Sequence, residues 1–230
     1  LKCFFFVRDG VLIKNYGYVY EIKKLKWLKG TIEAIKFLNK NKIKVIVITN
    51  QSGIARGYFS EKKLLFFHNK MNKILFKFKA KIDDFYYCPY HPFGKVKKYK
   101  KRTNLRKPGN GMLLQAIKKH KLEPSNCFMI GDERKDFLSS KKTKINFQFK
   151  KNYSLDKQVK KIVYGEQHKS LLRSGNSTPL SGTYFFLPIT LFLFFQIDLI
   201  VVIFCSLFFV LGLLSDLKIA SSYKLRLLFQ

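Results

Sequence analysis

Four polar clusters in this sequence hold the residue types that bind and transfer phosphoryl groups. A carboxylate holds a divalent cation or moves a proton, hydroxyl and backbone N–H groups hold phosphate oxygens, and lysine or arginine offsets their charge. Each cluster follows an expected strand or precedes an expected helix. In chain order they are Arg8-Asp9-Gly10, Thr49-Asn50-Gln51-Ser52-Gly53, Arg106-Lys107-Pro108, and Gly131-Asp132 with Asp136.

Alternating strands and helices must position these clusters. The apolar pattern predicts strands over 3–7, 43–48, 82–88, 127–130 and 145–149, and helices over 31–41, 61–78, 112–120, 133–142 and 154–162. This alternation indicates an α/β fold with right-handed crossovers and a doubly wound, mostly parallel sheet. The carboxyl ends of such strands meet in one crevice. We therefore expect the four clusters to lie close together in one domain over 1–165.

The order of the clusters and the residues in them resemble the sequence motifs of the haloacid dehalogenase (HAD) superfamily. Within it they resemble the D,D-heptose 1,7-bisphosphate phosphatases and the related histidinol-phosphate phosphatases. The resemblance spans about residues 4–150 and implies a HAD-like, Rossmannoid domain without a large cap. It also implies Mg²⁺-dependent hydrolysis of a phosphorylated sugar, a heptose bisphosphate, in the synthesis of lipopolysaccharide or surface-polysaccharide precursors. It is closest at Gly17–Tyr20, Ile48–Tyr58, Tyr86–Pro89 and Arg106–Pro108.

The same resemblance gives each matching residue a role. It makes Asp9 the general acid and base, Thr49 the hydroxyl that holds the phosphoryl group, and Lys107 the cation beside them. Substrate contacts are expected at Asn50, Gln51, Ser52 and Arg106, and Mg²⁺ ligands at Asp9, Asp132 and Asp136.

One position departs from the family pattern in a way that bears on activity. The family has Asp-x-Asp-Gly, whose first Asp attacks phosphorus, whereas this chain has Val7 there. An isopropyl group forms no acyl phosphate and ligates no metal, and loss of a nucleophile commonly costs several powers of ten in rate. We expect a very poor phosphatase. An inactive relative and a single-base reading error both account for Val7.

A second departure concerns zinc. Many heptose phosphatases hold zinc with Cys-x-His and Cys-x-Cys in the loop before the Arg-Lys pair. Here only Cys88 is in register and His91 is displaced, whereas tetrahedral zinc needs four ligands. We predict no zinc, and a loop held by its own packing through Tyr86, Tyr90, Phe93 and Tyr99.

The net charge of the chain bears on which classes of partner it is expected to bind. Lys and Arg number 45 against 14 Asp and Glu, which gives +31. No nucleic-acid-binding motif accompanies this charge, so biased codon usage is the favoured explanation and no nucleic-acid partner is predicted. The four cysteines show no paired spacing, which argues for a reducing compartment.

The C-terminal part changes character. A basic linker is expected over 166–182, and 183–230 contains two almost wholly apolar runs, 183–195 and 199–214, on either side of Asp198. Each run is shorter than the roughly 20 residues that span a bilayer. Two topologies are therefore open: one long tilted transmembrane helix, or a hairpin of two transmembrane helices. Basic residues at both ends favour a transmembrane helical hairpin with both ends in the cytoplasm, in contact with inner-membrane lipid.

This segment resembles the start of the polyprenyl-phosphate sugar-1-phosphate transferases, glycosyltransferase family 4. The matching stretches are Asn176–Gly182, Gly212–Leu217 and Arg226–Leu228, with Ser215-Asp216 where the family has Asp-Asp. The expected whole is a cytoplasmic phosphatase domain anchored to a bacterial inner membrane by a truncated transferase start. The rival interpretation, which Val7 favours, is a catalytically inactive, membrane-anchored module that binds phosphosugars or a partner.

Overall fold

The computed structural model describes residues 1–173, without the side chains of 169–173. The chain divides into two compact units, Leu1–Glu166 and Gln167–Gln230. Among the described residues, none of the helices has the length and apolar character needed to cross a bilayer. The predicted hairpin and the transferase-like stretches lie outside the described residues.

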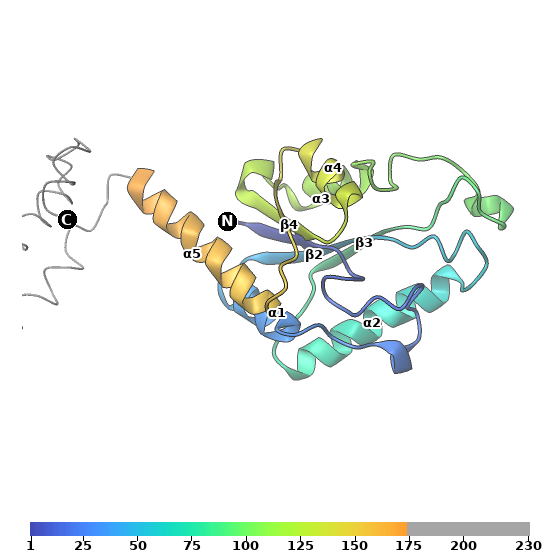
Figure 1. Ribbon diagram of the computed structural model, residues 1–230, viewed down its shortest axis with the longest axis horizontal. Helices are drawn as coiled ribbons and strands as arrows, with labels where there is room; N and C mark the ends of the chain where they lie inside the picture. The colour runs from blue at the N-terminus through green and yellow to red at the C-terminus, as the bar shows by residue number, and fades with distance from the viewer. Residues whose placement is uncertain (174–230) are drawn as a thin grey trace, which may run out of the picture. The chain divides into compact units, whose positions relative to one another are not determined.

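The first unit is built on one five-stranded parallel sheet (Figure 1). Its strand order is β3-β2-β1-β4-β5, and every neighbouring pair is parallel. The strands are β1 (Cys3–Phe6), β2 (Lys44–Asn50), β3 (Asp84–Cys88), β4 (Cys127–Gly131) and β5 (Asn146–Phe149). The predicted parallel α/β sheet is therefore confirmed.

Helices cover both faces of the sheet. In Figure 1, α1 and α2 lie on one side of the strands and α3 and α4 on the other, as in a doubly wound fold. The last helix continues to Arg173, so residues 166–173 of the predicted linker are helical. The helices are α1 (Thr31–Lys40), α2 (Glu61–Lys77), α3 (Gly111–His120), α4 (Arg134–Lys141) and α5 (Leu155–Arg173).

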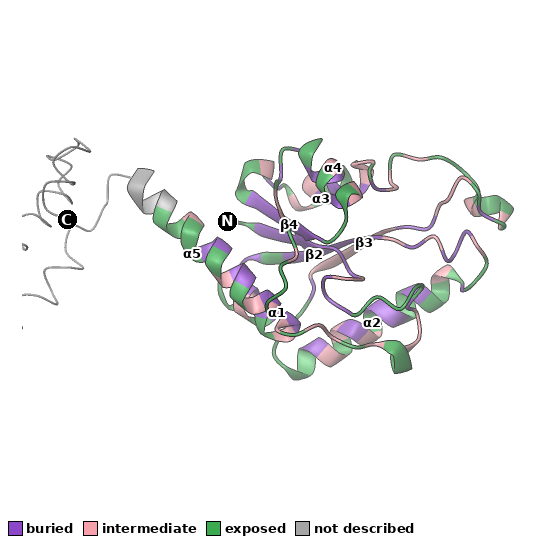
Figure 2. Ribbon diagram, viewed as in Figure 1, coloured by how far each residue is buried: buried purple, intermediate pink, exposed green. Residues whose placement is uncertain are grey.

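The central strand β1 is the core of this unit. Phe4, Phe5 and Phe6 are fully buried, because helices close both faces of a central parallel strand and leave no polar-facing side. Figure 2 shows that the strands are mostly buried and that the helices around them have exposed outer surfaces. The continuous apolar run before Asp9 thus fixes the strand on which the site is built.

The pairing of β1 brings the predicted clusters to one edge. Phe6 lies opposite Val47 of β2 and Ile130 of β4. The residues after these three strands therefore emerge side by side. Asp9 lies three residues after β1, Asn50 is the last residue of β2, and Asp132 directly follows β4. The crevice expected from the sequence is thus a consequence of parallel register.

We predict that Phe5→Ala destabilises the domain by roughly 3–5 kcal/mol, because it leaves a ring-sized cavity in a sheet enclosed on both faces. Phe93→Ala is the control, since Phe93 is 76% exposed and its loss should cost less than about 0.5 kcal/mol. Urea unfolding followed by circular dichroism measures both. Equal losses would contradict the central position of β1.

Candidate active site

A crevice of about 350 Å³ lies at the carboxyl edge of the sheet. Three of the four predicted clusters line it directly, and the fourth contributes through its neighbours Glu133 and Lys135. The lining residues are Asp9, Asn15, Gly17, Tyr18, Asn50, Gln51, Ser52, Arg106, Lys107, Glu133 and Lys135. The four clusters therefore lie around one crevice, as the sequence analysis expected of strand ends in a parallel sheet.

Asp9 is held in a fixed orientation beyond β1. The Arg8 guanidinium donates to both of its carboxylate oxygens, with Nη2–Oδ1 at 3.0 Å and Nε–Oδ2 at 3.1 Å. Gln51 Nε2 donates to Oδ2 at 3.0 Å. The side chain remains 19% exposed. The carboxylate is thus oriented by two donors and open to the crevice, as a group that exchanges protons with a ligand must be.

Arg8 was not predicted as a functional residue, and the structure shows why it matters. Its side chain is completely buried; Nη2 donates to the Val19 carbonyl at 2.7 Å, and Nη1 lies 3.1 Å from His68 Nε2. Burial, and then the nearby Arg8 charge, hold the pKa of His68 well below its usual value, so the ring is neutral and accepts from Arg8. A buried cation needs partners of this kind, which the sequence alone does not reveal.

Thr49 and Gln51 lie together at the end of β2. Both are almost fully buried, and Gln51 Nε2 donates to Thr49 Oγ1 at 2.9 Å as well as to Asp9. The Gln51 backbone N–H is fixed by the Cys88 carbonyl at 2.8 Å. The amide therefore links the expected acid/base to the expected phosphoryl-binding hydroxyl.

Lys107 and Asp136 form a buried ion pair. Lys107 Nζ lies 2.6 Å from Asp136 Oδ1, and both side chains are at most 2% exposed. The other oxygen, Asp136 Oδ2, accepts from the backbone N–H groups of Asp132 and Glu133 at the start of α4. Asp136 was expected to bind metal; instead its carboxylate is engaged by a lysine and a helix N-terminus.

Asn50 has a structural role besides the substrate contact expected of it. Its amide accepts from the Lys107 N–H at 3.1 Å and donates to the Lys107 carbonyl at 3.2 Å. This pair of hydrogen bonds holds the end of the 89–107 loop against the end of β2. Asn50 lines the crevice, but most of its hydrogen-bonding capacity positions Lys107.

Asp132 is the carboxylate best placed for a cation. It packs against Gly10, whose φ of +83° suits glycine, and a Cβ on Gly10 would lie 2.0 Å from Asp132 Oδ2. Burial, followed by repulsion from Asp136 and Glu133, raises the pKa of Asp132 to about 6. A carboxylate crowded by like charges fits a divalent cation, and Mg²⁺ commonly takes one or two carboxylates plus phosphate oxygens and water.

The expected Mg²⁺ ligands, Asp9, Asp132 and Asp136, stay a prediction, in which Asp9 contributes its backbone carbonyl. Among residues 1–173, no group of three or more His, Cys, Asp or Glu side chains is arranged to hold a metal ion. Asp136 is paired with Lys107, and Val7 has no donor atom. Val7 is 6% exposed and belongs to the hydrophobic core. Asp132 is left as the carboxylate that fits Mg²⁺ together with a ligand's own oxygens.

The loop between β3 and Lys107 is anchored by an acidic residue that the sequence did not single out. Glu61, the first residue of α2, accepts from Tyr87 Oη and Tyr99 Oη, both at 2.7 Å. The bond to Glu61 raises the pKa of Tyr99 to about 12. Of the four aromatic residues expected to hold this loop, Tyr90 and Tyr99 pack together, and Phe93, although 76% exposed, contacts the His91 ring. Tyr86 packs on the core of the domain and against His120.

Cys88 and His91 have other partners. Cys88 Sγ donates to the Tyr90 carbonyl at 3.9 Å, and His91 Nε2 lies 3.4 Å from Arg56 Nη2. Arg106 Nη1 donates to the Tyr90 carbonyl at 3.5 Å, and burial lowers the pKa of the Arg106 guanidinium. The loop thus delivers Arg106 to the crevice through protein contacts.

These features together define a HAD-type phosphatase domain: a parallel sheet with an acid, a hydroxyl and a buried lysine at the strand ends. The chain belongs to the HAD-superfamily family of D,D-heptose 1,7-bisphosphate phosphatases. The family model described as polynucleotide kinase 3 phosphatase matches residues 2–160.

Individual relatives agree with this family assignment. The chain is 45% identical over 135 residues to the D-glycero-beta-D-manno-heptose-1,7-bisphosphate 7-phosphatase of Haemophilus influenzae, covering 59% of this chain and 73% of that protein. It is 37% identical over 136 residues to the protein of the same name from Escherichia coli K12, covering 59% and 71%.

A solved structure shares the fold. The D,D-heptose 1,7-bisphosphate phosphatase of B. bronchiseptica, complexed with magnesium and phosphate, superposes with a TM-score of 0.60 at 22% identity. The match covers 72% of this chain and 99% of that one. It supports the architecture described above.

We predict that Lys107→Met costs roughly 3–5 kcal/mol of stability, because it leaves the Asp136 carboxylate buried without its cation. Lys135→Met is the matched control. Lys135 pairs with Glu133 in a half-exposed position, so its loss should cost at most about 1 kcal/mol. Chemical unfolding of the two variants gives the comparison, and similar costs would show that the buried pair does not support the site.

We predict that Glu61→Ala loosens the 89–107 loop without unfolding the domain, because two tyrosine hydroxyls lose their acceptor. Trypsin should then cut among the loop lysines at least about fivefold faster, since local opening exposes backbone that native contacts protect. Glu33→Ala, at an exposed position of α1, is the control. A loop loosened by EDTA but not by Glu61→Ala would instead indicate that a metal holds it.

Proposed function

We propose that this domain binds the phosphoryl group of a sugar bisphosphate of the heptose class in the crevice at the end of β1. The observation that carries the proposal is the hydrogen-bonded group of Asp9, Gln51 and Thr49 at the ends of β1 and β2, with the buried Lys107 lining the same crevice. Arg106 supplies a further cation at the lining. The relatives named as heptose-1,7-bisphosphate phosphatases support this substrate class, and with it a place in lipopolysaccharide precursor synthesis.

In this proposal each residue has a separate task. Thr49 and the N–H groups after β2 hold phosphoryl oxygens, and Lys107 offsets their charge. Asp9, oriented by Arg8 and Gln51, exchanges a proton with the sugar oxygen or with water. Arg106 and Ser52 contact the remainder of the substrate. Asp132 would hold Mg²⁺, which neutralises phosphate charge when bound.

Val7 determines how fast these site residues hydrolyse a bound substrate. It occupies the position at which the family's aspartate attacks phosphorus, and its side chain is buried among apolar neighbours. An aspartyl-phosphate therefore cannot form at this residue. We infer that the chain binds phosphosugar with little hydrolysis, which leaves a non-catalytic phosphosugar-binding module as the second candidate function.

Restoring the nucleophile tests this proposal. With Mg²⁺ and a heptose 1,7-bisphosphate, Val7→Asp should raise phosphate release by at least about a thousandfold, because the other members of the catalytic unit are present. Val7→Asn has nearly the same shape as Val7→Asp but no attacking oxygen, and should stay at the starting rate. Phosphate release is measured by a colorimetric assay, with circular dichroism to establish folding.

Two results would contradict the proposal. A folded Val7→Asp chain without activity would remove the phosphatase mechanism. Brisk turnover by the unmodified chain would show that another residue supplies the nucleophile.

We also infer a location at the inner face of a bacterial inner membrane. The apolar runs over 183–214 and the basic residues around them support this anchor. Protease protection in membrane vesicles distinguishes the two topologies, since a hairpin leaves only a short outer loop near Asp198.

A further inference from the structure

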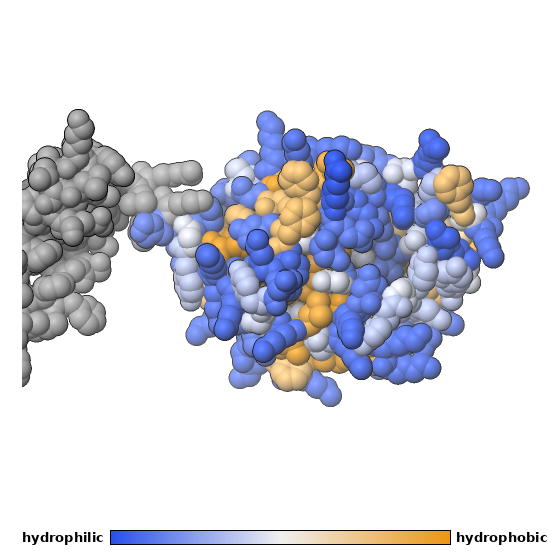
Figure 3. Space-filling model, in the orientation of Figure 1, coloured by the Kyte–Doolittle hydropathy of each residue, from blue (hydrophilic) through white to orange (hydrophobic). Residues whose placement is uncertain are grey.

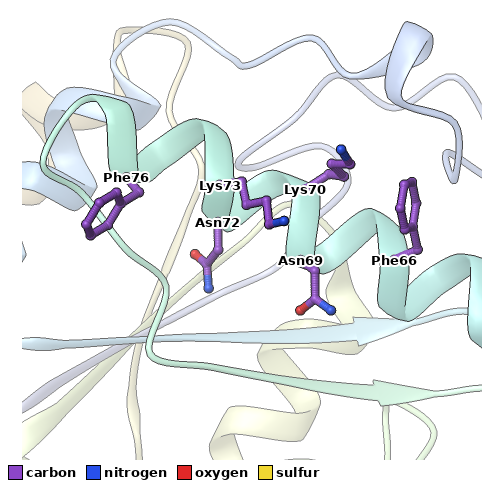
Figure 4. Close-up of a pocket in the computed structure, with 6 residues that line it drawn as sticks. All are labelled: Phe66, Asn69, Lys70, Asn72, Lys73 and Phe76. Atoms are coloured by element: carbon purple, nitrogen blue, oxygen red, sulfur yellow. The ribbon is translucent and has the colours of Figure 1, made fainter.

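The exposed side of α2 carries aromatic and basic residues in one stripe, which we call the α2 face: Lys62, Phe66, Asn69, Lys70, Asn72, Lys73, Phe76 and Lys77. Phe76 is 78% exposed and Phe66 is 57% exposed. In Figure 4 the two rings stand near the ends of a stretch of α2 with lysine and asparagine side chains between them. The three-to-four-residue spacing places these residues along one side of the helix.

The α2 face has an uncompensated positive charge. The helix contains one acidic residue, Glu61, and its carboxylate is engaged by Tyr87 and Tyr99. Lys62, Lys73 and Lys77 form no ion pair within the part of the chain that the structure describes. Lys70 lies over the Phe66 ring at 5.3 Å.

Water-exposed phenylalanine is costly where it recurs along one helix face. The visible surface of the domain is mainly hydrophilic, with hydrophobic residues in scattered patches (Figure 3). The separate apolar face of α2 is buried against the core, so its exposed face offers a lipid surface phenylalanine rings and lysine ammonium groups side by side. The rings enter the headgroup boundary, and the lysine stems extend their ammonium groups toward lipid phosphates.

We propose that the α2 face docks on an anionic lipid bilayer. Charge complementarity favours this partner, because the four lysines of the α2 face meet no acidic residue on that face. The rival polyanion, a nucleic acid, fits less well. Phe66 and Phe76 are ten residues apart, roughly 15 Å along the helix axis. Successive bases that stack on aromatic residues are far closer together.

A site-specific fluorescence experiment tests the proposal on the full chain. The one tryptophan, Trp27, is first replaced by Phe. Phe76→Trp then places an indole on the α2 face, and Phe93→Trp places one at a similarly exposed position of the 89–107 loop. Each variant is mixed with phosphatidylglycerol vesicles whose acyl chains carry bromine, a short-range quencher.

We expect the indole introduced by Phe76→Trp to lose at least about half its fluorescence, because interfacial helices bury their apolar side at acyl-chain depth. The Phe93→Trp control should keep its fluorescence. Phosphatidylcholine vesicles, or the added changes Lys62→Glu, Lys73→Glu and Lys77→Glu, should remove most of the quenching.

Three results would overturn the proposal. Equal quenching of both indoles would mean that another segment, such as 183–214, brings the chain to the membrane without the α2 face. Quenching that is the same in phosphatidylcholine would remove the role of the lysines. A spectral response to single-stranded RNA and none to vesicles would assign the face to nucleic acid. Because no sugar phosphate is present, these results are independent of the phosphatase assay.

Discussion

The buried pair between Lys107 and Asp136 connects more of this structure than any other contact described here. It joins the end of a long loop to the start of α4, and Asp136 at the same time accepts from the first N–H groups of that helix. Asn50 adds a two-way bond to the Lys107 backbone from the end of β2. The end of the 89–107 loop, the start of α4 and the end of β2 are thereby fixed around one lysine. A charge pair removed from water is costly unless its remaining hydrogen-bonding groups are satisfied, and here the backbone satisfies them.

A second buried cation, Arg8, organises the other side of the crevice. Its guanidinium connects the Asp9 carboxylate to His68 of α2 and to the Val19 carbonyl. The two cations hold different groups: Arg8 orients the Asp9 carboxylate, and Lys107 pairs with Asp136. Val7 directly precedes Arg8 in sequence, and its small apolar side chain at a buried strand end belongs to the core. The fold therefore needs no carboxylate at position 7.

The contact between Glu61 and two tyrosines shows how the loop keeps its shape through protein contacts. Glu61 begins α2, and the same helix places His68 against Arg8 and exposes the α2 face on its other side. One amphipathic helix thus serves the loop, the acid/base and a surface. Its buried positions, such as Leu64 and Met71, alternate at helical spacing with exposed lysines, which makes the three roles compatible.

The sequence by itself determined the parallel α/β sheet, the strand ends that meet at one crevice, and some of the residues that line it, such as Asp9, Gln51 and Lys107. It did so because apolar periodicity and strand-then-helix order are local signals, and parallel strands bring their ends together. Tertiary structure decided which carboxylate is free and which is used. Asp132 and Asp136 look alike in sequence, yet one packs on Gly10 and the other pairs with a lysine from another segment. It also decided that Arg8 is buried, that Asn50 positions Lys107, and that Glu61 holds the loop. Each of these depends on a partner distant in the chain, and local sequence patterns do not record such partners.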